Sequence, residues 1–251
     1  MNKSYRDVIT KGLIFKKIPF KESSLILEIF SNRFGKISVI AKGIRKEKNK
    51  NIGLIEVLNE LELVLYKKPE SQWYILKSAS LIKPHLFNVK FQNNVLMQAG
   101  IEIYRQLKIP KEDYILLYDL IIKYIEYLKK VDSNGIAIFW RFLLKVFIVL
   151  GINIDIKKCV HCNHEKNNFF AYYPQKHGFI CSDCYLPVFD SFIFKISEET
   201  SEIISNLNKI GAFLDKITIS EKTINQINNI FLTHLSEQFN KKFYLNTLEM
   251  Y

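Results

Sequence analysis

Four cysteines constrain the fold of this chain more than any other feature of its sequence. They form two Cys-x2-Cys pairs, and 18 residues separate Cys162 from Cys181. This spacing is typical of structural zinc sites, in which two tight turns bring four thiolates around one ion. Four protein ligands leave no open coordination position, so we predict a single structural Zn²⁺ bound by Cys159, Cys162, Cys181 and Cys184.

The same cysteines could also remain free thiols or form two disulfides. No apolar stretch follows the charged residues Met1–Asp7, so we expect no secretory signal and no disulfides in a reducing compartment. His161 and His164 could replace a ligand, but we expect them to be bystanders. A zinc-dependent deaminase would need His-x-Glu and a proline before the cysteine pair, whereas Ile180 precedes the second pair here. The sequence therefore does not favour a deaminase.

The first 82 residues have the pattern of β-strands. Five short segments rich in Ile, Val, Phe and Tyr alternate with turn residues: Val8–Ile18, Leu25–Phe30, Lys36–Ala41, Leu61–Tyr66 and Trp73–Ile82. Five strands in about 80 residues fit a small closed barrel, and the OB-fold is the commonest such barrel. We predict a nucleic-acid-binding OB-fold over residues 1–82.

After Pro84 the apolar period changes from 2 to 3.6. Helices are predicted on the apolar faces of Val95–Leu107, Tyr114–Leu128 and Ile136–Leu150, and again from Ser197 onward. The predicted fold is therefore α+β and multidomain: a barrel over 1–82, a helical domain formed by 83–158 and 191–251, and a zinc-binding insert at 159–190. The longest apolar run carries two cations and is too short for a bilayer, so we expect a soluble, cytoplasmic protein without a membrane partner.

The positive charge is concentrated near the N-terminus. The net charge is +11, yet 31 of the 36 basic residues are lysine, which indicates a compositional bias. Residues 1–80 hold 16 basic and 8 acidic residues, whereas residues 159–251 hold 8 and 10. Within Arg33–Lys50, seven basic residues accompany one acid, Glu47. The first domain therefore carries the informative part of the charge.

A cationic loop beside a barrel suits the phosphate backbone of nucleic acids, because each neutralised phosphate releases counterions. A merely solvated loop is the alternative. Trp73, next to a polar turn, could stack on bases; Phe15, Phe30, Phe34 and Tyr74 could too, but we expect these four in the core. The predicted DNA-binding residues are Arg33, Lys36, Lys42, Arg45, Lys46, Lys48, Lys50 and Trp73.

No motif points to catalysis. The five histidines are scattered, and neither G-x-S-x-G nor a phosphate-binding G-x-x-x-x-G-K-[ST] loop occurs. We therefore expect a protein that is not an enzyme. From the residues alone, a zinc-ribbon OB-fold module that binds RNA or the ribosome stays open as an alternative, and a nucleic-acid-processing enzyme with a dispersed active site is the third.

Several segments resemble the bacterial RecO family of DNA repair proteins. They are the opening strands over Gly12–Glu28, the hairpin at Phe34–Lys36 with the Ala-Lys-Gly-x-Arg motif within Val39–Arg45, and the segment Phe170–Cys181 that leads into the second cysteine pair. The chain departs from the family at Asn163, where glycine is usual, and at His177, which replaces one glycine of a pair. Asparagine tolerates left-handed backbone geometry, so the first cysteine turn should survive.

The resemblance implies a recombination mediator that acts in DNA recombination after DNA damage, in the RecFOR pathway. Such a protein binds single- and double-stranded DNA, anneals complementary strands and helps load RecA onto gaps, without nucleotide hydrolysis. The implied partners are RecR and the acidic C-terminal tail of the single-stranded DNA-binding protein (SSB), with RecA as an indirect partner. The implied location is the nucleoid.

Overall fold

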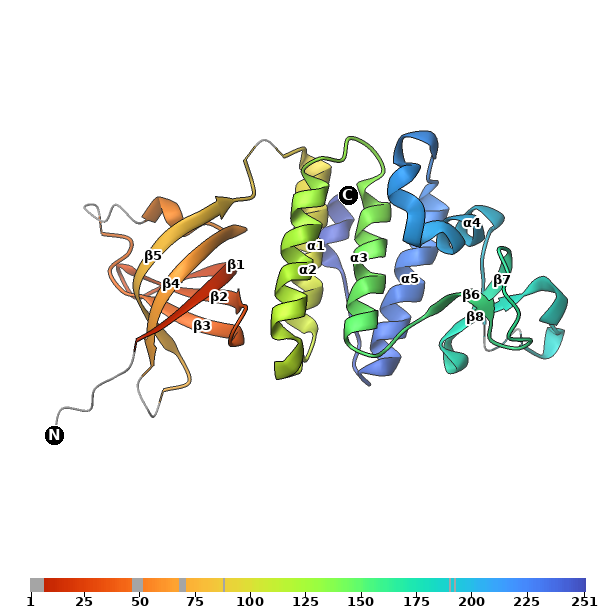
Figure 1. The fold of residues 1–251 in the computed structure, drawn as a ribbon, viewed down its shortest axis with the longest axis horizontal. Coiled ribbons are helices and arrows are strands. Elements are labelled where there is room, and N and C mark those ends of the chain that lie inside the picture. Colours follow the sequence, from red (N-terminus) through yellow and green to blue (C-terminus); the bar gives the residue numbers. More distant parts are fainter. Residues whose placement is uncertain (1–6, 47–51, 68–70, 88, 190, 192) are drawn as a thin grey trace. The chain divides into compact units, whose positions relative to one another are not determined.

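A computed structural model describes residues 7–46, 52–67, 71–87, 89–189, 191 and 193–251 (Figure 1). The chain divides into two compact units. The barrel unit combines Met1–Lys90 with Leu107–Glu126, and the helical unit combines Phe91–Gln106 with Tyr127–Tyr251. Over the described part of the chain, no helix is long and apolar enough to cross a membrane.

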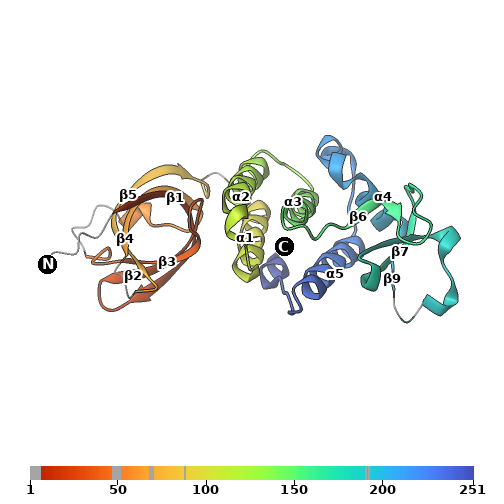
Figure 2. The same cartoon turned by 60° about the horizontal axis from the view of Figure 1, so that its bottom comes forward.

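All five predicted N-terminal strands are confirmed. They are β1 (Val8–Phe20), β2 (Ser24–Ser31), β3 (Gly35–Ala41), β4 (Asn59–Lys67) and β5 (Tyr74–Pro84). They close into a barrel in the order β1-β2-β3-β5-β4 (Figure 2). A short parallel pairing of β3 with β5, at Val39–Tyr74 and Ile40–Ile75, completes the ring.

The barrel encloses one apolar core. Alternate residues of each strand point inward, among them Ile14, Leu27, Val39 and Leu63, none of which is exposed to solvent. This alternation explains why the sequence has period 2 here, because the inward face of each strand is buried in the barrel core.

The barrel unit also includes most of helix α2 (Tyr114–Leu128). The rings of Tyr114 and Tyr118 lie 6.5 and 6.3 Å from that of Phe30. Gly35 permits this contact, because a Cβ there would lie 2.4 Å from the Tyr114 ring, and its φ of +64° suits glycine. The contacts thus group residues 107–126 with the barrel, whereas the sequence pattern grouped them with the helices.

A buried polar cluster joins α2 to the ends of β4 and β5. His85 is fully buried, with Nδ1 2.8 Å from Glu126 Oε1 and Nε2 3.8 Å from Glu60 Oε2. Tyr118 donates a hydrogen bond of 3.0 Å to Glu60, and Lys83 forms an ion pair with Glu126. Hydrogen bonding from His85, aided by Tyr118 and opposed by burial, lowers the pKa of Glu60 below its usual value.

The helical unit packs around α3 (Gly135–Val149), the apolar helix that the sequence predicts at Ile136–Leu150. Its Trp140 is fully buried and donates a 2.8 Å hydrogen bond to Asn228. The other long helices are α1 (Phe91–Gln106), α4 (Glu198–Asn206) and α5 (Glu221–Gln238). Side chains of Ser197 and Ser220 cap α4 and α5.

The helical pattern after Ser197 is interrupted. Residues Leu207–Ala212 form a 3₁₀ segment rather than a continuation of α4, although Leu207 and Ile210 remain buried as the pattern predicts. A Cβ at Gly211 would lie 2.5 Å from the Tyr127 hydroxyl oxygen, so the backbone approaches a neighbouring side chain closely here. The apolar periodicity located the buried side chains without distinguishing the two kinds of helix.

A small sheet separates α3 from α4 in the sequence. Its strands are β6 (Asp155–Cys159), β7 (Phe169–Tyr173), β8 (Gly178–Cys181) and β9 (Phe194–Lys195), in the order β6-β8-β7-β9. The sequence pattern predicted the insert but not its strands. These strands are two to five residues long, which leaves little alternation to detect.

Candidate metal centre and nucleic-acid surface

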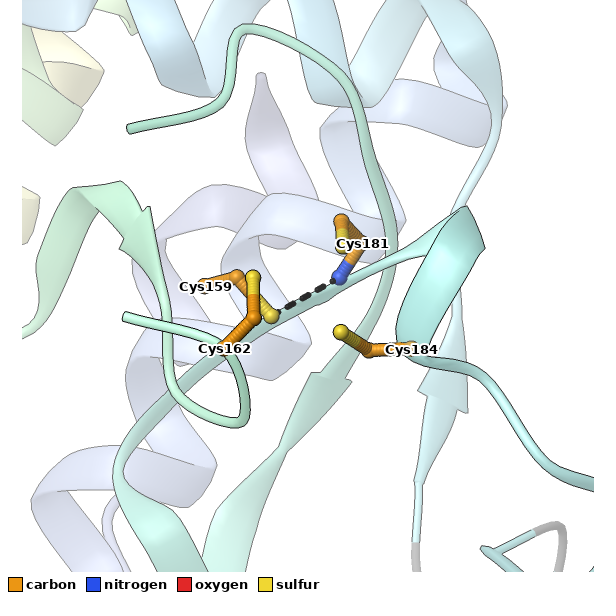
Figure 3. Close-up of side chains that lie close together, drawn as sticks. All are labelled: Cys159, Cys162, Cys181 and Cys184. Carbon is orange, nitrogen blue, oxygen red and sulfur yellow. Dashed lines mark hydrogen bonds between the residues drawn. The ribbon is translucent and has the colours of Figure 1, made fainter. Parts of the chain in front are cut away.

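The small sheet brings the four cysteines together. Cys159 and Cys181 end β6 and β8, which pair in parallel with Cys159 opposite Phe179. Cys162 lies in the turn after β6, and Cys184 ends a 3₁₀ turn, Ser182–Cys184, after β8. The four Sγ atoms lie within 4.8 Å of one another (Figure 3). A tetrahedron with Zn–S bonds of about 2.3 Å has edges of about 3.8 Å, so the cluster fits one Zn²⁺ after small side-chain rotations.

Backbone donors stabilise a thiolate at Cys159. The amides of His161 and Cys181 each donate to its Sγ at 3.4 Å; the second bond is the dashed line in Figure 3. Burial opposes ionisation, but amide donors from Cys162, Cys181 and His161 lower the pKa of Cys159 to about 7. Burial and hydrogen bonds with the other three sulfurs raise the pKa of Cys184 to about 12. Four crowded sulfurs cannot all ionise without a cation, and soft thiolates suit Zn²⁺.

The two departures from glycine keep the left-handed backbone that glycine favours. Asn163 has φ +58° and its amide donates to the Cys159 carbonyl at 2.9 Å, which closes the first cysteine turn. His177 has φ +52° at the turn before β8. The expectation that the first turn survives is met. Of the described residues, His161 and His164 stay outside the metal-ligand group, which holds only the four predicted cysteines.

The predicted DNA-binding cations occupy turns and strand ends of the barrel. Arg33 lies in the turn between β2 and β3, and Lys42, Arg45 and Lys46 follow β3; all four are exposed. Lys48 and Lys50 lie outside the described residues. The described part of the basic segment thus presents cations on two turns of the barrel rather than along one strand.

Three of these cations already have partners within the barrel unit. Lys36 donates to the carbonyl of Leu107. Arg33 donates to the Ile9 carbonyl at 2.8 Å and lies over the Phe34 ring. Arg45 donates to the carbonyls of Lys21 and Glu22 at 2.8 and 2.6 Å. The two arginines therefore fix turns, while their charge remains at the surface.

Trp73 is the exposed aromatic of the predicted set, with 38% of its surface accessible. Its ring meets that of Phe20 edge-on, with centroids 6.0 Å apart. Phe15 and Phe30 are buried, as expected, and stack on each other outside the barrel core, where Phe30 also contacts α2. Sequence reasoning missed Phe20 and Lys21, whose ammonium lies over the Phe20 ring. The sequence feature that could have identified these two residues is the turn predicted after Pro19.

Family models match nearly the whole chain. The model described as recombination protein O N terminal matches residues 5–85, and the one described as recombination protein O C terminal matches residues 90–245. These two matches correspond to the barrel with its linker and to the helices with the cysteine insert.

Curated relatives carry the same description. A DNA repair protein RecO of Prosthecochloris aestuarii is 32% identical over 154 residues, which are 61% of this chain and 58% of that protein. The RecO protein of Acetivibrio thermocellus is 23% identical across 93% of this chain and 92% of the relative. That of Mycoplasma mycoides is 26% identical across 90% of each. Similarity thus extends over the full length in some relatives and over about three fifths in others.

Proposed function

Because the chain belongs to the recombination protein O family, whose curated members are DNA repair proteins, we propose that it is a non-enzymatic recombination mediator. It binds single- and double-stranded DNA, anneals complementary strands and helps load RecA onto DNA coated with SSB. This role places the protein at the nucleoid.

The observation that carries the proposal is the group of exposed cations on the turns of the barrel. Lys42, Arg45 and Lys46 follow one another within five residues, and Arg33 marks a second turn. Lysine and arginine side chains at the surface contact phosphates without selecting a base sequence. A mediator needs this property, because it must act on any damaged sequence.

Annealing adds a requirement that this surface meets. Two complementary strands repel each other through their phosphates, and a protein that neutralises those charges brings the strands together. The Watson–Crick edges must stay free, so contacts to the backbone serve annealing, whereas base-edge contacts would obstruct it.

The cysteine cluster contributes structure to this function. Cys159, Cys162, Cys181 and Cys184 would hold one Zn²⁺ with no open position, and the ion would fix the two turns of the insert against each other. The ion supplies no reaction chemistry in this role.

RecR and the acidic C-terminal tail of SSB are the proposed protein partners. An acidic tail needs cations at its docking site, and Arg141 and Lys145 lie one turn apart on α3 in the helical unit. We propose that this pair contributes to tail binding.

Strand annealing in the presence of SSB tests the proposal. The expected result is faster annealing of complementary oligonucleotides, with affinity for single strands that falls steeply as salt rises. If about six phosphates are neutralised, log K against log salt should slope by about −4 for single strands and −5 for duplex. A flat salt dependence, or no annealing, would contradict the proposal. Preferential competition by single-stranded RNA would instead favour an RNA-binding module.

Matched variants locate the surface. Replacing Lys42 and Lys46 by Gln should reduce the single-strand slope by about 1.4, or 0.7 per contact, and slow annealing. Replacing Lys209 and Lys222 by Gln removes the same charge from exposed positions of the helical unit and should change neither quantity. Equal effects of the two pairs would place the DNA surface elsewhere.

A further inference from the structure

A partly exposed aromatic pair lies where the turn after β1 meets the start of β5. Trp73, with 38% of its surface accessible, meets the half-buried Phe20 edge-on, while the ammonium of Lys21 lies 5.5 Å from the Phe20 centroid. The other tryptophan of the chain, Trp140, is fully buried. A large indole at the surface, packed on a second ring and bordered by a cation, has the composition of a base-stacking site.

One residue holds this turn in place. The guanidinium of Arg45 donates to the carbonyls of Lys21 and Glu22, and its backbone amide donates to the carbonyl of Ser23 at 2.9 Å. Arg45 thus donates hydrogen bonds to three successive backbone carbonyls of the turn. Lys21 has φ +53°, a conformation that lysine adopts only when its surroundings enforce it.

Arg45 reaches the turn because the chain bends sharply after β3. Gly43 has φ +63°, and its amide donates to the hydroxyl of Ser24 at 3.3 Å. The bend lays residues 43–45 along the turn that carries Phe20 and Lys21. The Gly-x-Arg part of the sequence motif therefore has a local structural role, in which glycine makes the bend and arginine binds the carbonyls.

We propose that Trp73, supported by Phe20, is a base-stacking site for single-stranded DNA, and that Arg45 is a positioning residue that holds Phe20 and Lys21 beside it. This inference rests on the proposed DNA-binding function and adds a basis for strand selectivity. The base faces of a single strand are free to stack on the indole, whereas those of a duplex are covered by neighbouring base pairs. Stacking also leaves the pairing edges of the base free, so it is compatible with annealing.

The second aromatic pair of the barrel serves as a comparison. Phe34 and Tyr74 lie 5.5 Å apart with Arg33 over Phe34, so the composition is similar. Tyr74, however, packs against the barrel core, and burial raises the pKa of its hydroxyl. This pair stabilises the barrel, and of the four rings in the two pairs Trp73 is the exposed one.

Trp73→Ala tests the stacking site. At fixed salt it should weaken binding of oligo(dT) about tenfold, leave duplex binding unchanged and preserve the salt slope of the single-strand affinity. Trp73→Phe, which keeps a ring, should recover most of the affinity. Phe213→Ala removes an aromatic of similar exposure, 41%, from the helical unit and should have no effect. Oligo(dT) should also quench the Trp73 fluorescence of the wild-type protein.

Arg45→Lys tests the positioning role, because it keeps the charge but replaces the rigid planar guanidinium, whose Nη2 donates to both carbonyls, by a flexible ammonium. It should weaken oligo(dT) binding at least threefold and reduce the fluorescence response, with the salt slope unchanged. Lys42→Gln should do the reverse, lowering the slope by about 0.7 without changing the fluorescence response.

The outcomes separate the two hypotheses. If Trp73→Ala binds oligo(dT) as the wild type does while the steep salt slope persists, the stacking site is wrong and the proposed DNA-binding function stands. If Arg45→Lys matches the wild type in affinity and fluorescence, Arg45 has no positioning role. If the wild-type protein binds no DNA, the proposed function itself fails. Unchanged circular dichroism and thermal unfolding confirm that each variant is folded.

Discussion

The barrel and the cysteine insert differ in what holds them together. The barrel core contains eleven buried apolar residues drawn from β1 to β4 and the loops beside them, with partly buried side chains of β5 packed against it, and its exposed cations lie outside that core. The buried cluster around the cysteines of the insert is Cys159, Ala171, Ile180 and Cys181, so half of it consists of candidate metal ligands. Apolar burial is the main source of stability in the barrel core. If the cysteines bind a metal ion, as we propose, the insert depends in addition on the bonds that they form.

The two regions therefore differ in whether their distinctive side chains are also needed for folding. In the barrel, exposed side chains such as Lys42 and Trp73 can change without opening the core, so the surface is free to serve a ligand. In the insert, the chemically distinctive residues are the four cysteines, and we expect these same residues to hold the fold together. A Cys-x2-Cys pair therefore indicates how the insert folds, but it does not indicate which macromolecule the insert binds.

The largest expected effect comes from removing the metal. Chelation, or Cys159→Ser, should unfold residues 155–195 while leaving the barrel strands intact, because structural zinc sites contribute on the order of 10 kcal/mol to folding. Hydrogen exchange should show lost protection in β7 and β8 and unchanged protection in β2 and β4. Metal analysis of the wild-type protein should give one Zn²⁺ per chain; no bound metal together with four reactive thiols would refute the site.

Lys166→Ala is the matched control. It removes an exposed ion pair with Asp183 that joins the same two cysteine turns, with Nζ and Oδ2 2.7 Å apart. Exposed pairs contribute little, so protection of the insert should hardly change. An effect as large as that of Cys159→Ser would mean that the turns, rather than the metal, hold the insert.

The next largest effect should come from His85. His85→Ala would leave the buried carboxylate of Glu60 and the half-buried carboxylate of Glu126 without the imidazole between them, which we expect to cost about 3 kcal/mol in the free energy of unfolding of the barrel unit. Chemical denaturation followed by hydrogen exchange in β4 and α2 measures this. Lys83→Ala, which removes only the exposed partner of Glu126, should cost less than about 1 kcal/mol. A His85→Ala effect below that of Lys83→Ala would contradict the prediction.

Acid should weaken the two regions over different pH ranges. His234, between the Tyr172 hydroxyl and the Ile152 carbonyl, joins the insert to α5. Burial, reinforced by nearby His177 and opposed by the hydrogen bond to Ile152, lowers the pKa of His234 to about 4. The unfolded chain takes up this proton below about pH 6.5, so stability should fall between pH 6.5 and 4, by at most about 3 kcal/mol.

Glu60 behaves differently, because its pKa is lowered from a usual value of 4.5. Its contribution is complete above that pH and is lost only as the pH falls further, through the pKa of the folded state. Denaturation curves at pH 7, 5.5 and 4 should therefore show that His234→Gln flattens the loss above pH 4.5. Glu60→Gln should leave that interval unchanged. If Glu60→Gln, and not His234→Gln, flattened the loss of stability above pH 4.5, the predicted difference in pH range between the two regions would be wrong.

The smallest effect distinguishes two lysines of the barrel. Lys36 already donates to the carbonyl of Leu107, whereas Lys42 is exposed on the turn after β3. Lys42→Gln should lower the salt slope of single-strand binding by about 0.7, and Lys36→Gln should lower it by less than half of that. Fluorescence anisotropy over a salt series resolves this difference. Equal changes would show that Lys36 releases Leu107 when DNA binds.

Local sequence patterns predicted much of the fold. Alternation along Leu25–Phe30 and Lys36–Ala41 located two barrel strands, because one face of each is buried, and the cysteine spacing located the insert. Residues 107–126 show the limit of such patterns. Their apolar face fits any neighbour of suitable shape, and only the contacts of Tyr114 and Tyr118 with Phe30 assign them to the barrel unit.

The candidate site was predictable in the same uneven way. The four cysteines were identified by number, because metal geometry imposes a spacing on the sequence. The basic segment was identified as a charged stretch, but charge does not reveal a partner. From the sequence, Arg45 is predicted to contact phosphate. Its hydrogen bonds to two backbone carbonyls could not be predicted, because they depend on the folding of the β1–β2 turn beside it.

The five barrel strands, the long helices, the four-cysteine spacing and the location of the positive charge all follow from the sequence. These properties arise from periodicity, spacing and composition, which are local along the chain. Tertiary contacts establish that Phe20 and Lys21 accompany Trp73, that Lys36 is engaged with Leu107, and that His85 lies between Glu60 and Glu126. Each of these contacts joins residues far apart in sequence, and only the closure of the barrel and the packing of α2 bring them within reach.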